Sequence, residues 1–232
     1  MIGMEGIMKI KGILFDFNGT MLFDSELQEK AWEDFLRSKL NKDISNEEIA
    51  EHIHGGNNKD VLTYFFNRNF SNEEIEKLEE EKESLYRNMC LEDKDNLKLV
   101  KGLPELLDKL KENKIPVTIA TGAPLKNVEF YFEHLNLNKW FDMSKVVYTD
   151  GSFKGKPEPD VFLKAAEKIN VNIEECAIFE DAVLGLKAAG KANAGKIFVI
   201  SSTLDNEKLS EFKKISHIMH DYTEITIDDL LQ

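Results

Sequence analysis

The chain has 232 residues, of which 42% are hydrophobic and 31% charged, a balance typical of a folded globular protein rather than a disordered one. Lysine and arginine number 30 against 43 acidic residues, which gives a net charge of −13. That charge argues against a DNA or RNA partner, because it repels a phosphate backbone. A small phosphorylated ligand stays compatible with it, since a metal ion and one or two lysines reverse the sign locally.

Neither the N-terminus nor the cysteines point to export or to a membrane. The opening stretch MIGMEGIMKIKG is too short and too weakly hydrophobic for a signal peptide, and no apolar run approaches the about 20 residues of a membrane helix. Cys90 and Cys176 lie far apart and show no metal-ligand spacing, which predicts two reduced thiols. We therefore expect a cytoplasmic protein that does not associate with membranes.

The first predicted strand, KGILFDF at 11–17, is followed by a long helical region. Ser25 and Gln28 predict a capping box at the start of its first helix. Further helices are predicted at 58–70 and 73–89, and the acidic run in the second of these is expected to be a solvated helix face. No strand is expected between residues 24 and 97.

From about residue 98 onward, apolar strands alternate with amphipathic helices. Strands are predicted at 115–121, 145–150, 176–181 and 196–201, and helices at 102–113, 124–135, 159–169 and 183–190. This order predicts an α/β fold with a Rossmann-like, doubly wound parallel sheet. We expect residues 1–23 and 98–232 to form this core and residues 24–97 to form an inserted, all-helical cap.

Polar residues suited to phosphate chemistry follow the predicted strands. Asp16 lies near the end of the first strand with Asn18 just beyond it, Thr121 ends the second, and Glu180 with Asp181 ends the fourth. Lys156 precedes the helix at 159–169. Because open parallel sheets bind ligands at the carboxyl ends of their strands, these residues are candidates for one site. Each of them alone would be weak evidence, since acids and threonines often cap helices.

These stretches also resemble a known family. DFNGT, ATG, GKPEPD and FEDAVLG match, in order, the four motifs of the haloacid dehalogenase-like hydrolases. The helical insert resembles the cap of the β-phosphoglucomutase and phosphoglycolate phosphatase branch, so the likeness covers nearly the whole chain. It implies a Mg²⁺-dependent phosphohydrolase that acts on a small phosphorylated metabolite through an aspartyl-phosphate.

The resemblance, together with the chemistry of the side chains, implies a role for each residue. Asp16 would be the nucleophile and a Mg²⁺ ligand, with Asp181 and the backbone carbonyl of Asn18 as further ligands. Glu180 would bind the metal directly or hold its ligands, and Lys156 would neutralise the phosphoryl oxygens. Further phosphate contacts are expected from Gly19, Thr20, Thr121, Gly122 and Ala123.

Asn18 departs from the family pattern, in which an aspartate two residues after the nucleophile is the general acid and base. Such a group typically contributes about 10²–10⁴-fold, and an amide cannot exchange a proton. We expect a slow phosphatase, or one selective for good leaving groups, unless Asp24, Glu26 or His54 supplies the proton. A sugar-phosphate mutase is the next alternative, and a non-catalytic protein that binds a phosphorylated ligand is the third. A dehalogenase has no use for the acidic pair at 180–181.

The loop HIHGGNNKD at 52–60 resembles the substrate-contacting loop of the mutase branch. His54 and Asn58 stand where that branch has a basic residue and an arginine, and Lys59 is a partial substitute. The missing arginine argues against a bisphosphate intermediate. We expect hinges near 22–25 and 94–98, and a monomer or weak homodimer.

Overall fold

The computed structural model describes residues 9–53, 57–200, 212 and 215–231. Its centre is a parallel sheet of six strands in the order β3-β2-β1-β4-β5-β6. The strands are β1 (Gly12–Phe15), β2 (Val117–Pro124), β3 (Val147–Thr149), β4 (Cys176–Glu180), β5 (Lys196–Ile200) and β6 (Ile215–Met219). The predicted α/β fold with a parallel, doubly wound sheet is therefore confirmed.

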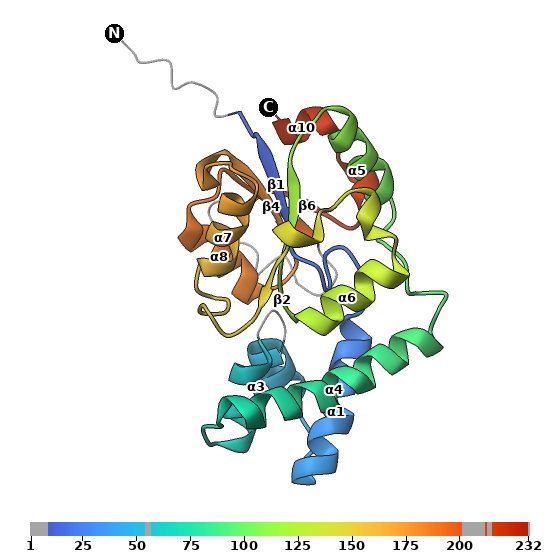
Figure 1. Ribbon diagram of the computed structural model, residues 1–232, viewed down its shortest axis with the longest axis vertical. Helices are drawn as coiled ribbons and strands as arrows, with labels where there is room; N and C mark the ends of the chain where they lie inside the picture. Colours follow the sequence, from blue (N-terminus) through green and yellow to red (C-terminus); the bar gives the residue numbers. More distant parts are fainter. Residues whose placement is uncertain (1–8, 54–56, 201–211, 213–214, 232) are drawn as a thin grey trace.

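Helices cover both faces of the sheet (Figure 1). One face carries α7 (Asp160–Lys168) and α8 (Val183–Ala192); the other carries α5 (Leu103–Glu112), α6 (Leu125–His134) and α10 (Ile227–Leu231). In β1, Leu14 packs with the α7 and α8 side, whereas Ile13 and Phe15 pack with the other side. Burial on both faces explains why β1 is an unbroken apolar run.

Between β1 and α5, the described part of the chain forms helices and no strand. They are α1 (Ser25–Leu40), α2 (Asn46–Glu48), the π-helical turn η1 (Ile49–Ile53), α3 (Asn58–Phe66) and α4 (Asn72–Glu92). We call them the helical insert. It lies beyond the carboxyl ends of the strands (Figure 1) and has its own apolar cluster around Trp32, Phe35 and Leu62. The domain boundaries at residues 24 and 97 stay a prediction.

The capping box expected at Ser25 and Gln28 is wrong. Ser25 is the first residue of α1, and the side chain of the N-cap residue Asp24 makes no capping hydrogen bond to the helix backbone. The carboxylate of Asp24 turns back instead and accepts a hydrogen bond from the backbone N–H of Gly19 at 3.0 Å. The Gln28 side chain donates a hydrogen bond to Asp24 and accepts one from Lys82, so it does not cap the start of the helix.

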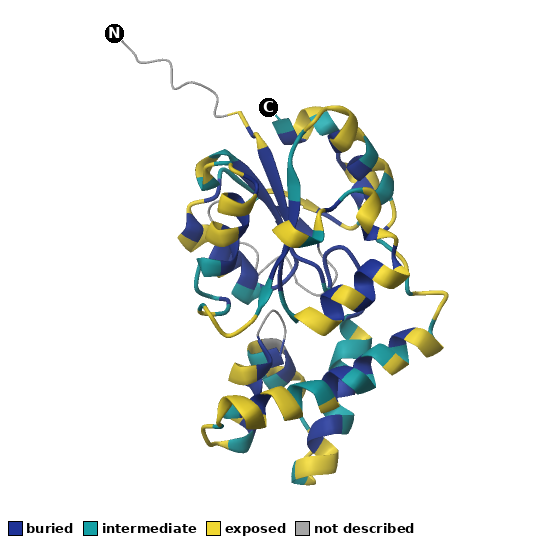
Figure 2. Cartoon of the chain, in the orientation of Figure 1, coloured by how far each residue is buried: buried dark blue, intermediate teal, exposed yellow. Residues whose placement is uncertain are grey.

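The solvated face expected for the acidic run of α4 is only partly correct. Buried and exposed residues alternate along this helix (Figure 2). Lys82 and Glu83, which belong to the charged run, are 1% and 3% exposed. These two residues are buried because α4 packs against both α1 and α6. The sequence of α4 alone does not indicate this packing.

No described helix combines the length and the apolar character needed to span a membrane.

Candidate active site

The carboxyl ends of β1 and β4 bring three acids together. Asp16 follows β1 directly, Glu180 is the last residue of β4, and Asp181 comes next. The two strands are neighbours at the point where the strand order reverses, which is where such sheets place ligands. All three side chains are buried and offer oxygens within 4.8 Å of one another. Three residues separated by up to 165 positions in sequence therefore form one acidic centre.

Lys156 is the cation of this centre. Its side chain is 3% exposed, and its Nζ donates hydrogen bonds to Asp16 Oδ1 and Glu180 Oε1. Burial alone would lower the pKa of Lys156, but the two carboxylates outweigh it and hold that pKa above its usual range. The lysine therefore stays charged and faces the position where a phosphoryl group would meet Asp16.

Two glycines leave the space that the side chains of Asp181 and Glu180 occupy. Gly19 has φ +76°, and a Cβ there would lie 2.1 Å from Asp181 Oδ2. A Cβ on Gly185, in the first turns of α8, would lie 1.7 Å from Glu180 Oε1. Glu180 is fixed from its other side, because its Oε2 accepts the backbone N–H groups of Asp181 at 2.7 Å and Ala182 at 2.9 Å.

The donor set suits a divalent cation. Three buried carboxylates face a single lysine, so negative charge is in excess. Burial and the neighbouring Glu180 raise the pKa of Asp16 to about 7 in spite of Lys156, and burial with Glu180 and Asp16 raises that of Asp181 well above its usual range. A hard cation would offset this excess of negative charge, and carboxylate oxygens are the ligands that such a cation prefers. Because Glu180 is occupied by Lys156 and two N–H groups, Asp16 and Asp181 are the carboxylates best able to hold a metal.

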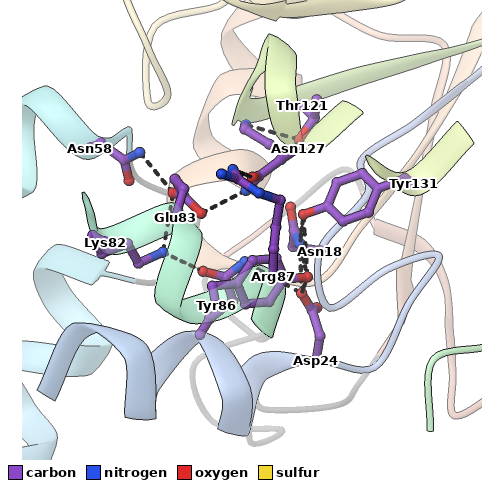
Figure 3. Close-up of polar contacts among 12 residues, drawn as sticks. Asn18, Asp24, Asn58, Lys82, Glu83, Tyr86, Arg87, Thr121, Asn127 and Tyr131 are labelled. Carbon is purple, nitrogen blue, oxygen red and sulfur yellow. Dashed lines mark hydrogen bonds and ion pairs between the residues drawn. The ribbon is translucent and has the colours of Figure 1, made fainter. Parts of the chain in front are cut away.

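Asn18 points its amide nitrogen away from this centre. Its Nδ2 donates to Asp24 Oδ2 at 2.6 Å and to the Tyr131 hydroxyl at 2.8 Å (Figure 3), and it lies 3.3 Å from the Tyr86 hydroxyl. An ionised carboxylate only accepts hydrogen bonds, so the NH₂ of Asn18 must face Asp24. The Tyr86 hydroxyl also donates to Asp24.

Asp24, although burial raises its pKa, is fully engaged. Its two oxygens receive donors from Asn18, Tyr86, Gln28 and the Gly19 backbone. The carboxylate thus orients Asn18 and has no bond directed at the Asp16 side. Tyr86 comes from α4 and Tyr131 from α6, so this hydrogen-bonded cluster also joins the helical insert to the core.

A pocket opens over the acidic centre, between the core and the helical insert. From the core it is lined by Asp16, Asn18, Asp181, Lys156 and the carboxyl end of β2, with Thr121, Gly122 and Ala123. The Thr121 hydroxyl accepts the N–H of Ala123 at 3.1 Å. It does not cap α6, whose N-cap is Pro124. Gly19 and Thr20 lie behind the acids instead, and the Thr20 hydroxyl donates to Asp181 Oδ1 at 3.1 Å.

The insert contributes the opposite wall, with Gln28, Trp32, Ile53, Asn58, Lys82 and Glu83. Asn58 is brought to the pocket, but Lys59 is not: it is exposed and lines a separate groove. His54 lies outside the described residues. Glu26 is absent from the residues that line the pocket.

Several wall residues were missed from the sequence. Lys82, Glu83 and Asn127 lie within ordinary amphipathic helices and carry no local mark of burial. Of these three residues, Asn127 alone had a sequence signal for a place in the site, because it follows the ATG stretch within the first turn of a helix. Its Nδ2 donates to Glu83 Oε2 at 2.6 Å, and its Oδ1 accepts from Arg87 at 2.7 Å (Figure 3).

The fold and the site together define an enzyme of the phosphoryl-transfer type, with a carboxylate, a lysine and an acidic pair at the ends of parallel strands. Residues 10–193 match the family model of the haloacid dehalogenase-like hydrolases. The chain belongs to this family, and it is a phosphatase of that type.

Curated relatives and solved structures agree with this placement. The chain is 29% identical to a fructose-1-phosphate phosphatase of Escherichia coli over 81% of its length and 95% of the relative's. It is 30% identical to a glycerol-1-phosphate phosphohydrolase of Saccharomyces cerevisiae, over 88% of the chain and 80% of the relative. A family IA, variant 3 hydrolase of Entamoeba histolytica superposes with a TM-score of 0.84 at 36% identity, covering 95% and 97% of the two chains.

A phosphomutase also shares the fold. A β-phosphoglucomutase of Clostridium difficile has a TM-score of 0.76 at 24% identity and covers 94% of each chain, a likeness that concerns the fold alone. The predicted resemblance to the haloacid dehalogenase-like hydrolases, in the branch with a helical cap, is therefore confirmed.

Proposed function

We propose that the chain is a Mg²⁺-dependent phosphohydrolase that acts on a small sugar or polyol phosphate through an aspartyl-phosphate on Asp16. The observation that carries the proposal is the buried cluster of Asp16, Lys156, Glu180 and Asp181 at the floor of the pocket. The names of the relatives, a fructose-1-phosphate phosphatase and a glycerol-1-phosphate phosphohydrolase, support the substrate class. Two free, buried cysteines are in keeping with a cytoplasmic enzyme.

Asp16 is the nucleophile of this proposal. Its carboxylate attacks the phosphorus, an acyl–phosphate bond forms, and the bond from phosphorus to the leaving oxygen breaks. Water then hydrolyses the aspartyl-phosphate and releases inorganic phosphate. Lys156 holds positive charge beside Asp16, and Thr121 with Gly122 and Ala123, at the carboxyl end of β2, would contact the phosphoryl group.

Mg²⁺ would be held by Asp16, Asp181 and the backbone carbonyl of Asn18. When bound, it offsets the repulsion between the nucleophile and the phosphate and orients the transferring group. Glu180 positions Lys156 and the first residues after β4 rather than binding metal. Gly19 and Thr20 act on the same ligands from behind, one by leaving room for Asp181 and the other by a hydrogen bond to it.

We infer further that turnover is slow or selective for good leaving groups. The Asn18 amide carries no proton that it can exchange, and its NH₂ is held by Asp24 and Tyr131. Asp24 is close, yet the donors around both of its oxygens leave it no role in proton transfer to a substrate. An acyl or aryl phosphate leaves without protonation, whereas a sugar alkoxide does not.

Among the described residues that line the pocket, nothing favours the mutase alternative. Asn58, at the place of the mutase arginine, is 8% exposed and donates to Glu83 Oε1 at 2.8 Å (Figure 3). It offers no charge to a second phosphate.

The test is Mg²⁺-dependent phosphate release from acetyl phosphate, p-nitrophenyl phosphate, fructose 1-phosphate and glycerol phosphate, with Asp16→Asn as the blank. We expect all four to react and the first two to react fastest, by about 10²-fold or more, the usual contribution of a general acid. Equal rates would show that another acid serves the site. Rates no higher than the blank would favour a protein that binds a phosphorylated ligand without turnover.

A further inference from the structure

Two opposite charges lie side by side in the wall that faces the catalytic carboxylates. Lys82 and Glu83 are consecutive residues of α4, and both line the pocket. Their side chains are 1% and 4% exposed, with Lys82 Nζ 3.1 Å from Glu83 Oε1. Charged side chains are almost never buried to this degree unless they are paired, so the pair is a built feature of the wall.

Each charge has further partners that hold it in place. Lys82 Nζ donates to Gln28 Oε1 at 2.6 Å and lies 4.9 Å from the centre of the Trp32 ring. Glu83 accepts one hydrogen bond from Asn58 and another, at 2.6 Å, from Asn127 (Figure 3). The carboxylate thus receives donors from α3, α4 and α6, and the lysine is directed toward it.

The pair leaves the far wall of the pocket without net charge. Among the described residues that line the pocket, the cations are Lys82 and Lys156, and each is bound to carboxylates. A second anionic group on a substrate would meet Glu83 close by and a lysine that is already neutralised. Bringing such a group out of water against a like charge is unfavourable. An uncharged hydroxyl meets no such opposition, and the amides of Gln28, Asn58 and Asn127 are groups that pair with hydroxyls.

We propose that the buried Lys82–Glu83 pair makes this pocket select phosphomonoesters with an uncharged, hydroxyl-bearing far end and reject those with a second anionic group. Glu83 is the specificity-determining residue, because it keeps Lys82 from binding a carboxylate or a second phosphate. The inference rests on the proposed function only in assuming that the phosphoryl group of the ligand sits at Asp16.

Glycerol 3-phosphate and 3-phosphoglycerate are a matched pair of probes, because they differ at the far carbon, a hydroxymethyl in one and a carboxylate in the other. Binding is measured by calorimetry with the Asp16→Asn protein in Mg²⁺, so that the result does not depend on turnover. We expect glycerol 3-phosphate to bind at least about tenfold more tightly, the discrimination typical of one unfavourable charge contact. Equal binding, tighter binding of 3-phosphoglycerate, or binding of neither probe would overturn the proposal.

Glu83→Gln in the same background tests the residue itself. The amide keeps the shape of the side chain but releases the charge of Lys82, so the preference is expected to move toward 3-phosphoglycerate by about tenfold or more. Glu81→Gln is the control: it makes the same charge change on α4, at a carboxylate that pairs with Lys39 at the surface, and should leave the ratio unchanged. An unchanged ratio in folded Glu83→Gln would refute the role of Glu83. If that variant does not fold, Lys82→Gln serves instead, and it should weaken 3-phosphoglycerate further.

The same substrates assayed with the unmodified Asp16 protein separate the two proposals. Selective binding without phosphate release would refute the phosphohydrolase and leave the specificity inference standing. Phosphate release at equal rates from both probes, with equal binding, would support the phosphohydrolase and refute the specificity inference.

Discussion

Replacing Asn18 with aspartate should turn the enzyme into a better phosphatase for sugar and polyol phosphates. The new carboxyl would stand where the amide nitrogen now lies 2.6 Å from Asp24 Oδ2. Two ionised carboxylates at that separation would repel by about 6 kcal/mol at an effective dielectric constant of 20. That energy corresponds to more than about four pKa units, so the pair keeps one proton at neutral pH. The variant would therefore carry an acid that is protonated and ready to donate.

The expected gain for Asn18→Asp is about 10²-fold in kcat with glycerol phosphate or fructose 1-phosphate, at the low end of the range for a general acid. Acetyl phosphate and p-nitrophenyl phosphate should gain less than about threefold, because their leaving groups need no proton. Steady-state phosphate release at pH 7 with saturating Mg²⁺ measures both. Asn18→Ser, which also removes the amide but adds no acid, is the matched control and should show no gain. A glycerol phosphate rate within about threefold of the natural enzyme would refute the reasoning that Asn18 limits proton transfer.

Three further outcomes follow from the geometry. Gly185→Ala would drive a methyl group into Glu180 and should cost about 1–3 kcal/mol in unfolding experiments and most of kcat, whereas Gly190→Ala on the same helix, with nothing within 4 Å, should be neutral or slightly stabilising. Burial, with neighbouring carboxylates, raises the pKa of Glu79 to about 7. The folded protein therefore holds the proton of Glu79 more tightly than the unfolded chain does. The free energy of unfolding should fall as the pH rises from about 4.5 to 7. Glu79→Gln should abolish that slope and stabilise the protein by about 1 kcal/mol at pH 8, after allowance for its partial exposure; an unchanged urea midpoint would contradict this. EDTA should stop phosphate release. Mg²⁺ should raise the melting temperature of the natural protein but not that of Asp181→Asn, because the substitution removes one of the carboxylates proposed to bind the metal. Equal shifts in melting temperature would exclude Asp181 as a ligand.

β1, β4 and β5 were predictable because they are largely apolar and are followed by polar residues. β6 was not, since the middle of its ISHIM run is exposed and it lies at the edge of the sheet. An edge strand with one partner needs no continuous apolar pattern.

The core side of the site was predictable for a different reason. Asp16, Glu180 and Asp181 stand next to strand ends, so the sheet topology alone converges them. Lys156 comes from the loop between β3 and α7 and was predicted from its GKPEPD setting. The wall from the insert depends on how helices pack, which no local pattern encodes. Lys82 and Glu83 look like surface residues of an amphipathic helix. The bonds of Tyr86 to Asp24 and of Asn18 to Tyr131 join residues 62 and 113 positions apart in the chain.

The position of β1 in the middle of the sheet has a consequence for how the enzyme folds. Ile13 pairs with Val117 on one side and with Ala177 on the other, so the strand that leads to Asp16, the proposed nucleophile, closes loops of about 100 and about 160 residues. Loop closure must precede the gain from such distant contacts, and proteins rich in them fold slowly. During synthesis β1 leaves the ribosome first but has to wait for β4 before both of its edges are covered. We therefore expect the acidic centre to be among the last parts of the molecule to form, because a chain interrupted before β4 lacks Glu180 and Asp181.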